Sequence, residues 1–288
     1  MNERWNLDSL YHGFSDPNFT GDLQALKVAC GRFDTFTKSL EEMDPAHALR
    51  QGVESLEEIA RLVNQLAEYA SLRQAADTGD AEANSAMGQV MAVYSQCAGA
   101  DARFQAYAAE LPNLDALLEA DELLRQYQFY FRQVREGSRY LLGSQGEDIM
   151  ARMQLSGSSA WSDLQAYLTS TVEVDYDGGI TNLSAIRNLA YDGNPAVRKA
   201  AYEAELACYD KIKDSVAFAL NSIKLETINA AQLRGYESPL DKALKGARMQ
   251  RATLDAMFAA IDEYLPKFWA YLKAKAKALG HELSLIHI

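Results

Sequence analysis

The chain has 288 residues, of which 48% are hydrophobic and 24% are charged, so it can bury one large core or two modest ones. Its formal net charge of −12 argues against binding to nucleic acid or to an anionic membrane, because phosphate contacts require clustered Lys and Arg side chains. The sequence has neither an apolar run of about 18 residues nor a basic start followed by an apolar stretch, which predicts a cytoplasmic protein without a membrane span or a signal peptide.

Helical periodicity dominates the first third of the chain, where apolar residues recur at the spacing of one helix face. Asp44 and Pro45 separate two helices, and Asp44 is expected to cap the second because proline suits a first helical turn. A turn at 77–80 (DTGD) precedes a third long helix, which 111–113 (LPN) ends. We therefore predict a long-helix N-terminal lobe over residues 1–112.

Several shorter helices are expected between residues 113 and 170. We assign the aromatic cluster at 127–131 (YQFYF), and also Trp161 and Trp269, to a core or an interface. Residues 155–161 (LSGSSAW) are typical of a loop that caps a new helix, in which serine side chains accept hydrogen bonds from free backbone N–H groups.

One β-hairpin is predicted near residues 171–182. The segment 171–176 (TVEVDY) alternates and is rich in β-branched residues, and 177–179 (DGG) supplies a turn before a short return strand. Ser184 is expected to cap the helix that follows. Together with the shorter helices, this hairpin forms a predicted central domain over residues 113–195.

Long helices are expected again in a third domain, residues 196–288. Residues 196–233 form one run whose apolar side chains lie on several sides, so we expect other elements to cover it. These side chains are Leu206, Ile212, Val216, Phe218, Leu220, Ile223, Leu225 and Ile228. A break at 234–240 (RGYESPL) precedes a last helical stretch at 251–279, which we expect to be interrupted near Pro266. The predicted fold class is mainly α with one short hairpin.

The three cysteines, Cys30, Cys97 and Cys208, are far apart and form no C-x-x-C pair. This spacing argues against a disulfide framework and against a thiolate zinc site. We therefore predict three buried free thiols in a reducing cytosol.

The four histidines of the chain are His12, His47, His281 and His287. The segment 281–287 (HELSLIH) superficially resembles the H-E-x-x-H zinc motif, whose two histidines face the same way on a helix. Here the histidines are six positions apart, so at about 100° per residue they point in different directions. Leu285 occupies the place of the second ligand. We predict no zinc site in this segment.

Other candidate groups also have structural explanations. Residues 157–159 (GSS) are compatible with an anion-binding nest at a helix start, but one glycine and two serines are common in a capping loop, which is the interpretation that we favour. The adjacent glutamates at 41–42 and 57–58 are expected to be solvated. The sequence contains no nucleophile elbow, Walker loop or paired-glycine fingerprint. It therefore assigns no catalytic, metal-ligating or substrate-binding residue.

Three segments stand out in order along the chain: 5–11 (WNLDSLY), 155–161 (LSGSSAW) and 234–240 (RGYESPL). The second precedes the hairpin, and the third follows 188–192 (NLAYD) and a long helix. In this order and at this spacing, they resemble the oligoendopeptidase F family of zinc metallopeptidases, which are relatives of thimet oligopeptidase. The resemblance covers the chain from its first residue to about residue 280.

This resemblance implies a mostly helical clamshell around a deep channel, in which short peptides are cut and from which folded proteins are excluded. In the family, an H-E-x-x-H helix and a later Glu hold zinc, and the Glu of the motif activates the zinc-bound water. Those elements lie downstream of the region that this chain resembles. The resemblance therefore implies the N-terminal portion of a zinc metalloendopeptidase, with no zinc bound by this chain alone. It also implies that residues 196–288 are the truncated start of the catalytic domain.

Two alternatives stay open at this point. One is a non-catalytic helical scaffold or peptide-binding protein, and the other is an unrelated helical enzyme that uses carboxylates. Residues 283–288 (LSLIHI) do not resemble the continuation of the family, so we expect a truncated chain with a short foreign tail. Truncation would leave apolar surface exposed on the helices after residue 200.

Overall fold

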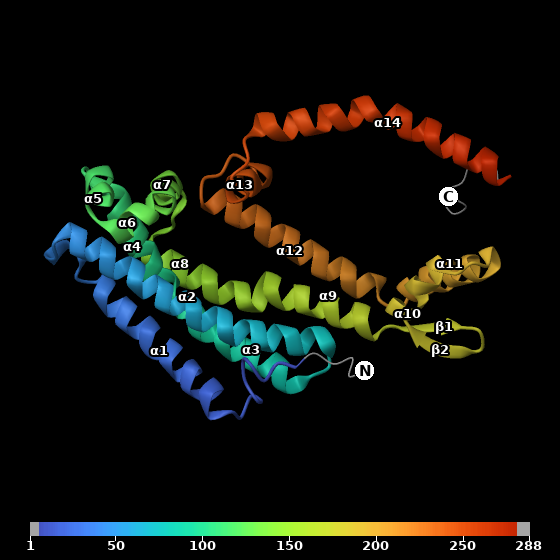
Figure 1. Cartoon of the computed structure of the whole chain (residues 1–288), viewed down its shortest axis with the longest axis horizontal. Helices are drawn as coiled ribbons and strands as arrows, with labels where there is room; N and C mark the ends of the chain where they lie inside the picture. The colour runs from blue at the N-terminus through green and yellow to red at the C-terminus, as the bar shows by residue number, and fades with distance from the viewer. Residues whose placement is uncertain (1–5, 281–288) are drawn as a thin grey trace. The chain divides into compact units, whose positions relative to one another are not determined.

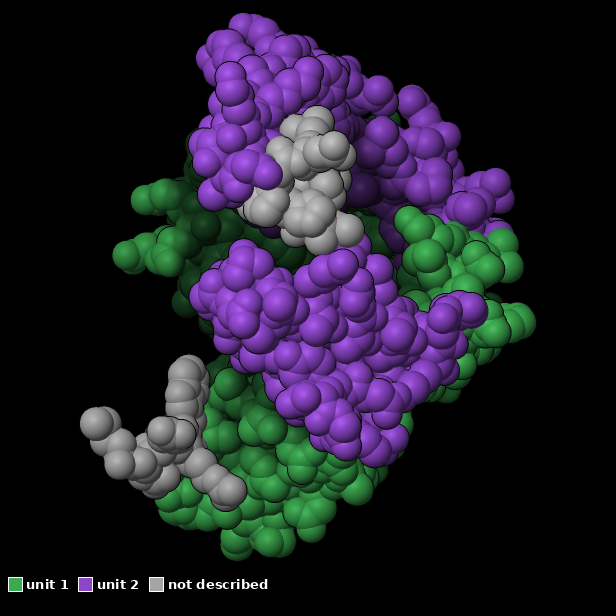
Figure 2. All heavy atoms as spheres, turned by 90° about the vertical axis from the view of Figure 1, so that its right-hand side faces the viewer, with its two compact units in different colours: residues 1–170, 214–226 green, residues 171–213, 227–288 purple. Residues whose placement is uncertain are grey.

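The computed structural model describes residues 6–280, which are almost entirely helical, so the predicted fold class is confirmed (Figure 1). The chain forms two compact units, which Figure 2 colours separately. Unit 1 comprises residues 1–170 and 214–226, and unit 2 comprises residues 171–213 and 227–288. No helix in the described range combines the length and the apolar composition needed to cross a bilayer.

Unit 1 is a stack of helices. They are α1 (Pro17–Thr37), α2 (Pro45–Ala76), α3 (Ala81–Tyr94), α4 (Ala98–Glu110), α5 (Leu114–Ala120), α6 (Glu122–Gln126), α7 (Gln128–Gly137), α8 (Gly143–Gln154) and α9 (Ala160–Thr171), with part of α12 (Lys213–Leu233). The helices α1, α2 and α3 lie side by side, and α4 packs against α1, α7 and α8 (Figure 1).

Aspartate caps fix the starts of the first three helices. Asp44 accepts a hydrogen bond from the backbone N–H of His47 at 3.0 Å, as predicted. Asp16 and Asp80 cap α1 and α3 in the same way. The predicted third long helix is divided, because the chain tightens into a 3₁₀ turn at Ser95–Cys97 between α3 and α4.

The core of unit 1 contains a close local contact between α2 and α4. Phe104 of α4 is fully buried and meets Phe33 and Phe131 edge-on, with ring centroids 6.2 Å apart in each pair. A Cβ added to Gly52 of α2 would lie only 2.1 Å from Cε2 of Phe104. Position 52 therefore requires glycine, because any side chain there would displace the ring. In the predicted aromatic cluster, Phe131 is buried as expected, but Phe129 is exposed.

The segment before α1 is anchored by Tyr11. Its ring is buried in edge contact with Phe19 and Tyr69, and its hydroxyl donates to Oδ2 of Asp22 at 2.8 Å. Burial and the Asp22 carboxylate raise the pKa of Tyr11 well above its ordinary value. The aromatic side chain therefore fixes the chain that leads into α1.

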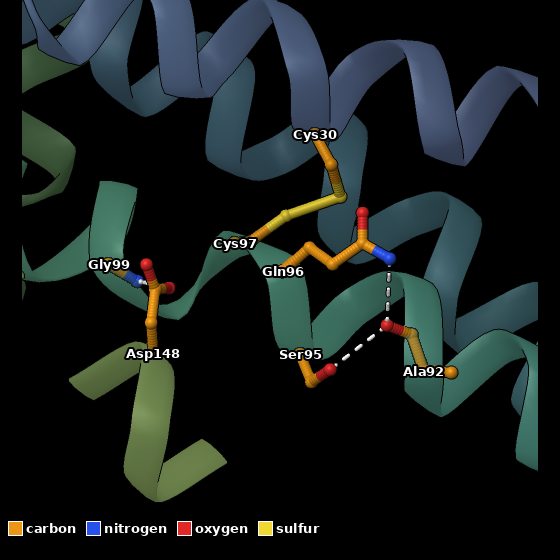
Figure 3. The surroundings of a disulfide bond; sticks show 7 residues. All are labelled: Cys30, Ala92, Ser95, Gln96, Cys97, Gly99 and Asp148. Atoms are coloured by element: carbon orange, nitrogen blue, oxygen red, sulfur yellow. Dashed lines mark hydrogen bonds between the residues drawn. A yellow bond between two sulfur atoms is a disulfide. The ribbon is translucent and has the colours of Figure 1, made fainter. Parts of the chain in front are cut away.

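Cys30 and Cys97 form a disulfide bond between α1 and the 3₁₀ turn before α4 (Figure 3). Both residues are buried, and their Cα atoms are 5.6 Å apart. The prediction of free thiols is wrong for this pair, because the fold joins positions that are 67 residues apart. Cys208 is buried and free, as predicted. Beside the bond, the backbone N–H of Gly99 donates to Oδ1 of Asp148 at 2.7 Å, which connects α4 to α8 (Figure 3).

Unit 2 contains the predicted hairpin. Strand β1 (Glu173–Tyr176) pairs antiparallel with β2 (Gly179–Asn182). Asp177 and Gly178 between them have φ values of 50° and 75°, which is the pattern of a tight hairpin turn. The next helix, α10 (Leu183–Asn188), is capped not by Ser184 as predicted but by Asn182, whose Oδ1 accepts from the N–H of Ala185 at 2.9 Å.

The helix predicted over residues 196–233 is two helices, α11 (Pro195–Tyr209) and α12. Between them, the N–H groups of residues 210–212 donate to carbonyl oxygens three positions earlier, which ends the α-helical pattern. Nζ of Lys211 reaches the carbonyl oxygen of Glu173 at 2.8 Å and Oδ2 of Asp175 at 2.9 Å on β1. The break therefore coincides with a tertiary contact that helical periodicity does not reveal.

The remaining helices of unit 2 are α13 (Pro239–Gly246) and α14 (Arg251–Leu279). The predicted break before α13 is confirmed, with Gly235 at φ 76°. The predicted interruption at Pro266 is wrong, because α14 continues through it. One proline removes one backbone donor, and the flanking turns keep the helix intact.

Replacing Gly52 with alanine should destabilise the protein by about 1–3 kcal/mol, because the new methyl group displaces Phe104. Gly88 is a matched control, since it lies inside α3 with nothing within 4 Å of an added Cβ. Gly88→Ala should be neutral or stabilising by up to about 1 kcal/mol. Urea unfolding followed by circular dichroism measures both variants, and equal midpoints would contradict the close contact.

Denatured, unreduced protein should offer one thiol to alkylation, that of Cys208, and three after reduction. Mass spectrometry of the alkylated chain counts them. Reduction should lower the free energy of unfolding by about 4 kcal/mol through loop-closure entropy. Three alkylated cysteines without reductant would refute the bond between Cys30 and Cys97.

Candidate functional site

The histidines with described positions do not form a metal centre. His12 is exposed, with Nδ1 3.6 Å from the carboxylate of Asp8, and His47 is exposed in the first turn of α2. The segment 281–287, with its superficial zinc motif, lies outside the described residues. Within residues 6–280, no group of three or more His, Cys, Asp or Glu side chains is placed to hold a metal ion.

The loop at 155–159 holds the carboxylate of Glu226, which extends from α12. The backbone N–H of Ser158 donates to Oε2 of Glu226 at 2.6 Å, and the Ser158 hydroxyl donates to Oε1 at 2.7 Å. Here the chain forms a π-helical turn between α8 and α9, which lie end to end (Figure 1). Gly157 leaves the helical conformation, with φ −95° and ψ −118°. The interrupted helical pattern allows the Ser158 N–H to bind an external acceptor.

A side chain at position 157 would displace the Glu226 carboxylate from this contact. A Cβ there would lie 2.3 Å from Oε2 of Glu226. The anion-binding interpretation of 157–159 therefore has a counterpart in the structure, but the bound anion is the protein's own carboxylate. The prediction that serine side chains cap α9 is wrong for Ser158, because its hydroxyl donates to Glu226. This loop fixes α12 to unit 1.

The glutamate pairs noted in the sequence are exposed, as predicted, and two of their members also have partners. Glu57 accepts a hydrogen bond from the Tyr127 hydroxyl, and Glu58 pairs with Arg32 at 2.7 Å. Both contacts join α2 to neighbouring helices, so they are structural contacts of the kind that contribute little to stability at a surface.

The helices α12 and α14 expose large apolar side chains. They include Phe218, Leu220, Leu225, Ile228 and Leu233 on α12, and Met257, Phe258, Ile261, Tyr264, Phe268, Trp269 and Tyr271 on α14. Phe218 is 70% exposed, so the prediction that other elements cover α12 is wrong for the described residues. Trp269 is 57% exposed and lies in no core, and its assignment to an interface stays a prediction. Trp161 is only half-buried. Within unit 2, α14 packs extensively against no other described element. Exposed apolar surface of this extent is typical of an interaction face.

Comparisons with known proteins give a consistent family likeness. A family model described as Oligopeptidase F matches residues 108–173, which include the loop at 155–159. Oligopeptidase PepF of Bacillus subtilis is 24% identical over 99% of this chain and 43% of its own length. The plasmid oligoendopeptidase F of Lactococcus lactis is 23% identical over 96% of this chain and 47% of its own length. The chain thus spans about half the length of the curated relatives it matches.

The fold is also found among solved structures. The crystal structure of oligoendopeptidase-F from Enterococcus faecium superposes with a TM-score of 0.80, at 19% sequence identity. The match covers 93% of this chain and 54% of that one. At this level of identity, the likeness establishes a shared fold.

Replacing Glu226 with glutamine should loosen the loop at 155–159, because an amide supplies only one acceptor oxygen in place of two. We expect a loss of about 1–3 kcal/mol, the range for a hydrogen-bonded charged group, and faster amide exchange at Ser158. Glu263→Gln on α14 removes the same charge from an exposed position and serves as the control. Hydrogen exchange measured by mass spectrometry reports both, and unchanged exchange at Ser158 in Glu226→Gln would contradict this role.

Proposed function

Because the chain resembles the N-terminal half of oligoendopeptidase F-type peptidases, we propose that it is the substrate-confining part of a zinc-dependent oligoendopeptidase that hydrolyses short peptides. The supporting observation is coverage: relatives named as oligopeptidases match 96% and 99% of this chain with about half of their own length. In this proposal, the catalytic residues belong to the other half of the parent protein.

The exposed faces of α12 and α14 support the same proposal. Side chains such as Phe218, Phe268 and Trp269 are of the kind that a covering domain buries. The buried cluster that includes apolar residues of α1, α2 and α4 shows the contrast, because its side chains are covered by one another. We propose that the second half of the peptidase covers the faces that this chain leaves exposed.

Zinc in such a peptidase would supply a Lewis acid and a bound water of lowered pKa. The donor set in residues 6–280 does not fit a zinc ion, because no three ligand-type side chains converge. We therefore derive no hydrolytic step from this chain. Its proposed contribution is to limit which peptides reach the catalytic residues.

The proposed organisation keeps the three domains predicted from the sequence: residues 1–112 as N-terminal lobe, 113–195 as central domain and 196–288 as the start of the catalytic domain. The family match at 108–173 falls largely within the second. A cytoplasmic location is also proposed. The bond between Cys30 and Cys97 counts against it, because disulfides are rare in a reducing cytosol. Blocking thiols in intact cells before lysis tests this location.

The purified 288-residue chain should neither bind stoichiometric zinc nor cleave a short fluorogenic peptide in a chelator-sensitive way. The same gene, expressed to the length of the relatives, should do both. Metal analysis and peptide hydrolysis with and without chelator measure the two proteins. Chelator-sensitive cleavage by the 288-residue chain would contradict the proposal, and so would an inactive, zinc-free longer protein.

A further inference from the structure

Unit 1 contains a cavity of about 470 Å³. It lies among α2, α3, α4, α7 and α8, and much of its wall is apolar, with Leu56, Ile59, Met91 and Leu155 contributing. This volume is within the range of small-molecule sites in proteins. The cavity is therefore large enough for a ligand with an apolar body.

One carboxylate lines this cavity. Asp101 of α4 accepts a hydrogen bond at Oδ2 from Nε2 of Gln105, one helical turn away, at 2.7 Å. The hydroxyl-bearing rings of Tyr94 from α3 and Tyr130 from α7 line the same cavity. A carboxylate, an amide and two phenol rings thus converge in an otherwise largely apolar space, which is the composition of a specific ligand pocket.

The described wall of the cavity contains an acidic side chain without a basic one to balance it. Among the described residues, no lysine, arginine or histidine lines the cavity. Burial raises the pKa of Asp101, and the nearby Glu147 carboxylate raises it further, while the hydrogen bond from Gln105 acts in the opposite direction. Burial and the charge of Asp101 also raise the pKa values of Tyr94 and Tyr130, so all three side chains interact with one another. A cation in the cavity would relieve this imbalance.

We propose that the cavity binds a small organic ammonium ion with an apolar or aromatic body, with Asp101 as its counter-ion and the rings of Tyr94 and Tyr130 beside the charged head. Cations bind favourably over the faces of aromatic rings, and a charge-assisted hydrogen bond to a carboxylate is stronger than a neutral one. An anionic ligand would meet the like charge of Asp101, and the charge of the nearby Glu147 adds to this repulsion. A metal ion would find only one carboxylate in the wall, which is too few ligands for a protein metal site.

Isothermal titration of the 288-residue chain with phenylbutylamine, and with the neutral phenylbutanol as its isostere, tests this proposal. The amine should bind at one site per chain and at least about tenfold more tightly than the alcohol, because only the amine forms the charged hydrogen bond. Asp101→Asn should lose this preference. Asp163→Asn removes the same charge from an exposed position on α9 and should bind the amine like the unmodified chain.

A second variant keeps the proposal testable if Asp101→Asn fails to fold. Ala151→Phe fills the cavity from α8 and should abolish binding while leaving the carboxylate in place. The affinity of the unmodified chain for the amine should fall as the pH is lowered, because Asp101 becomes protonated and loses its charge. The groups that interact with Asp101 are Tyr94, Tyr130, Glu147 and Gln105. Absence of amine binding, equal affinity for the alcohol, or full affinity in either cavity variant would overturn the proposal.

Discussion

Phe104 of α4 rests directly against the backbone of α2 at Gly52, and the arrangement of unit 1 depends on this contact. Because glycine has no side chain, the Phe104 ring can lie against α2 at this position, and Phe33 and Phe131 meet the same ring edge-on. Further contacts hold α4 in this position, including the ion pair between Arg103 and Asp34.

Burial is complete around that contact and incomplete elsewhere in the chain. The buried apolar residues of α1, α2 and α4 belong to one cluster, whereas α14 exposes aromatic side chains between residues 258 and 271. A helix of this composition normally gains most of its stability from tertiary packing. The carboxylate of Glu226 partly compensates on α12, because it holds the first part of that helix against the loop at 155–159. This uneven burial is the physical basis for proposing that another part of the peptidase covers α14.

The features that could be predicted from the sequence are those specified by neighbouring residues. Asp44 and Pro45 mark a helix start because a cap needs only its own first turn, and the hairpin follows from β-branched alternation before the turn at Asp177 and Gly178. The resemblance to oligoendopeptidase F could also be found, because its three segments keep their order and spacing along the chain.

The features that were missed depend on residues far apart in the chain. The disulfide joins cysteines separated by 67 positions, and the contact between Ser158 and Glu226 spans 68. Gly157 is noticeable in the sequence near that contact, but no neighbouring residue indicates which carboxylate packs against it. The exposure of Trp269 escaped prediction for another reason, since an aromatic side chain at helical spacing looks the same whether or not a partner covers it.

The nucleotide sequence beyond codon 288 in the source genome tests the central claim most directly. Our account predicts an open reading frame that continues in frame for about the length of this chain and encodes an H-E-x-x-H helix motif with a later glutamate. A natural stop codon directly after codon 288, with no such motif encoded downstream, would contradict it and would favour a helical scaffold without catalytic residues.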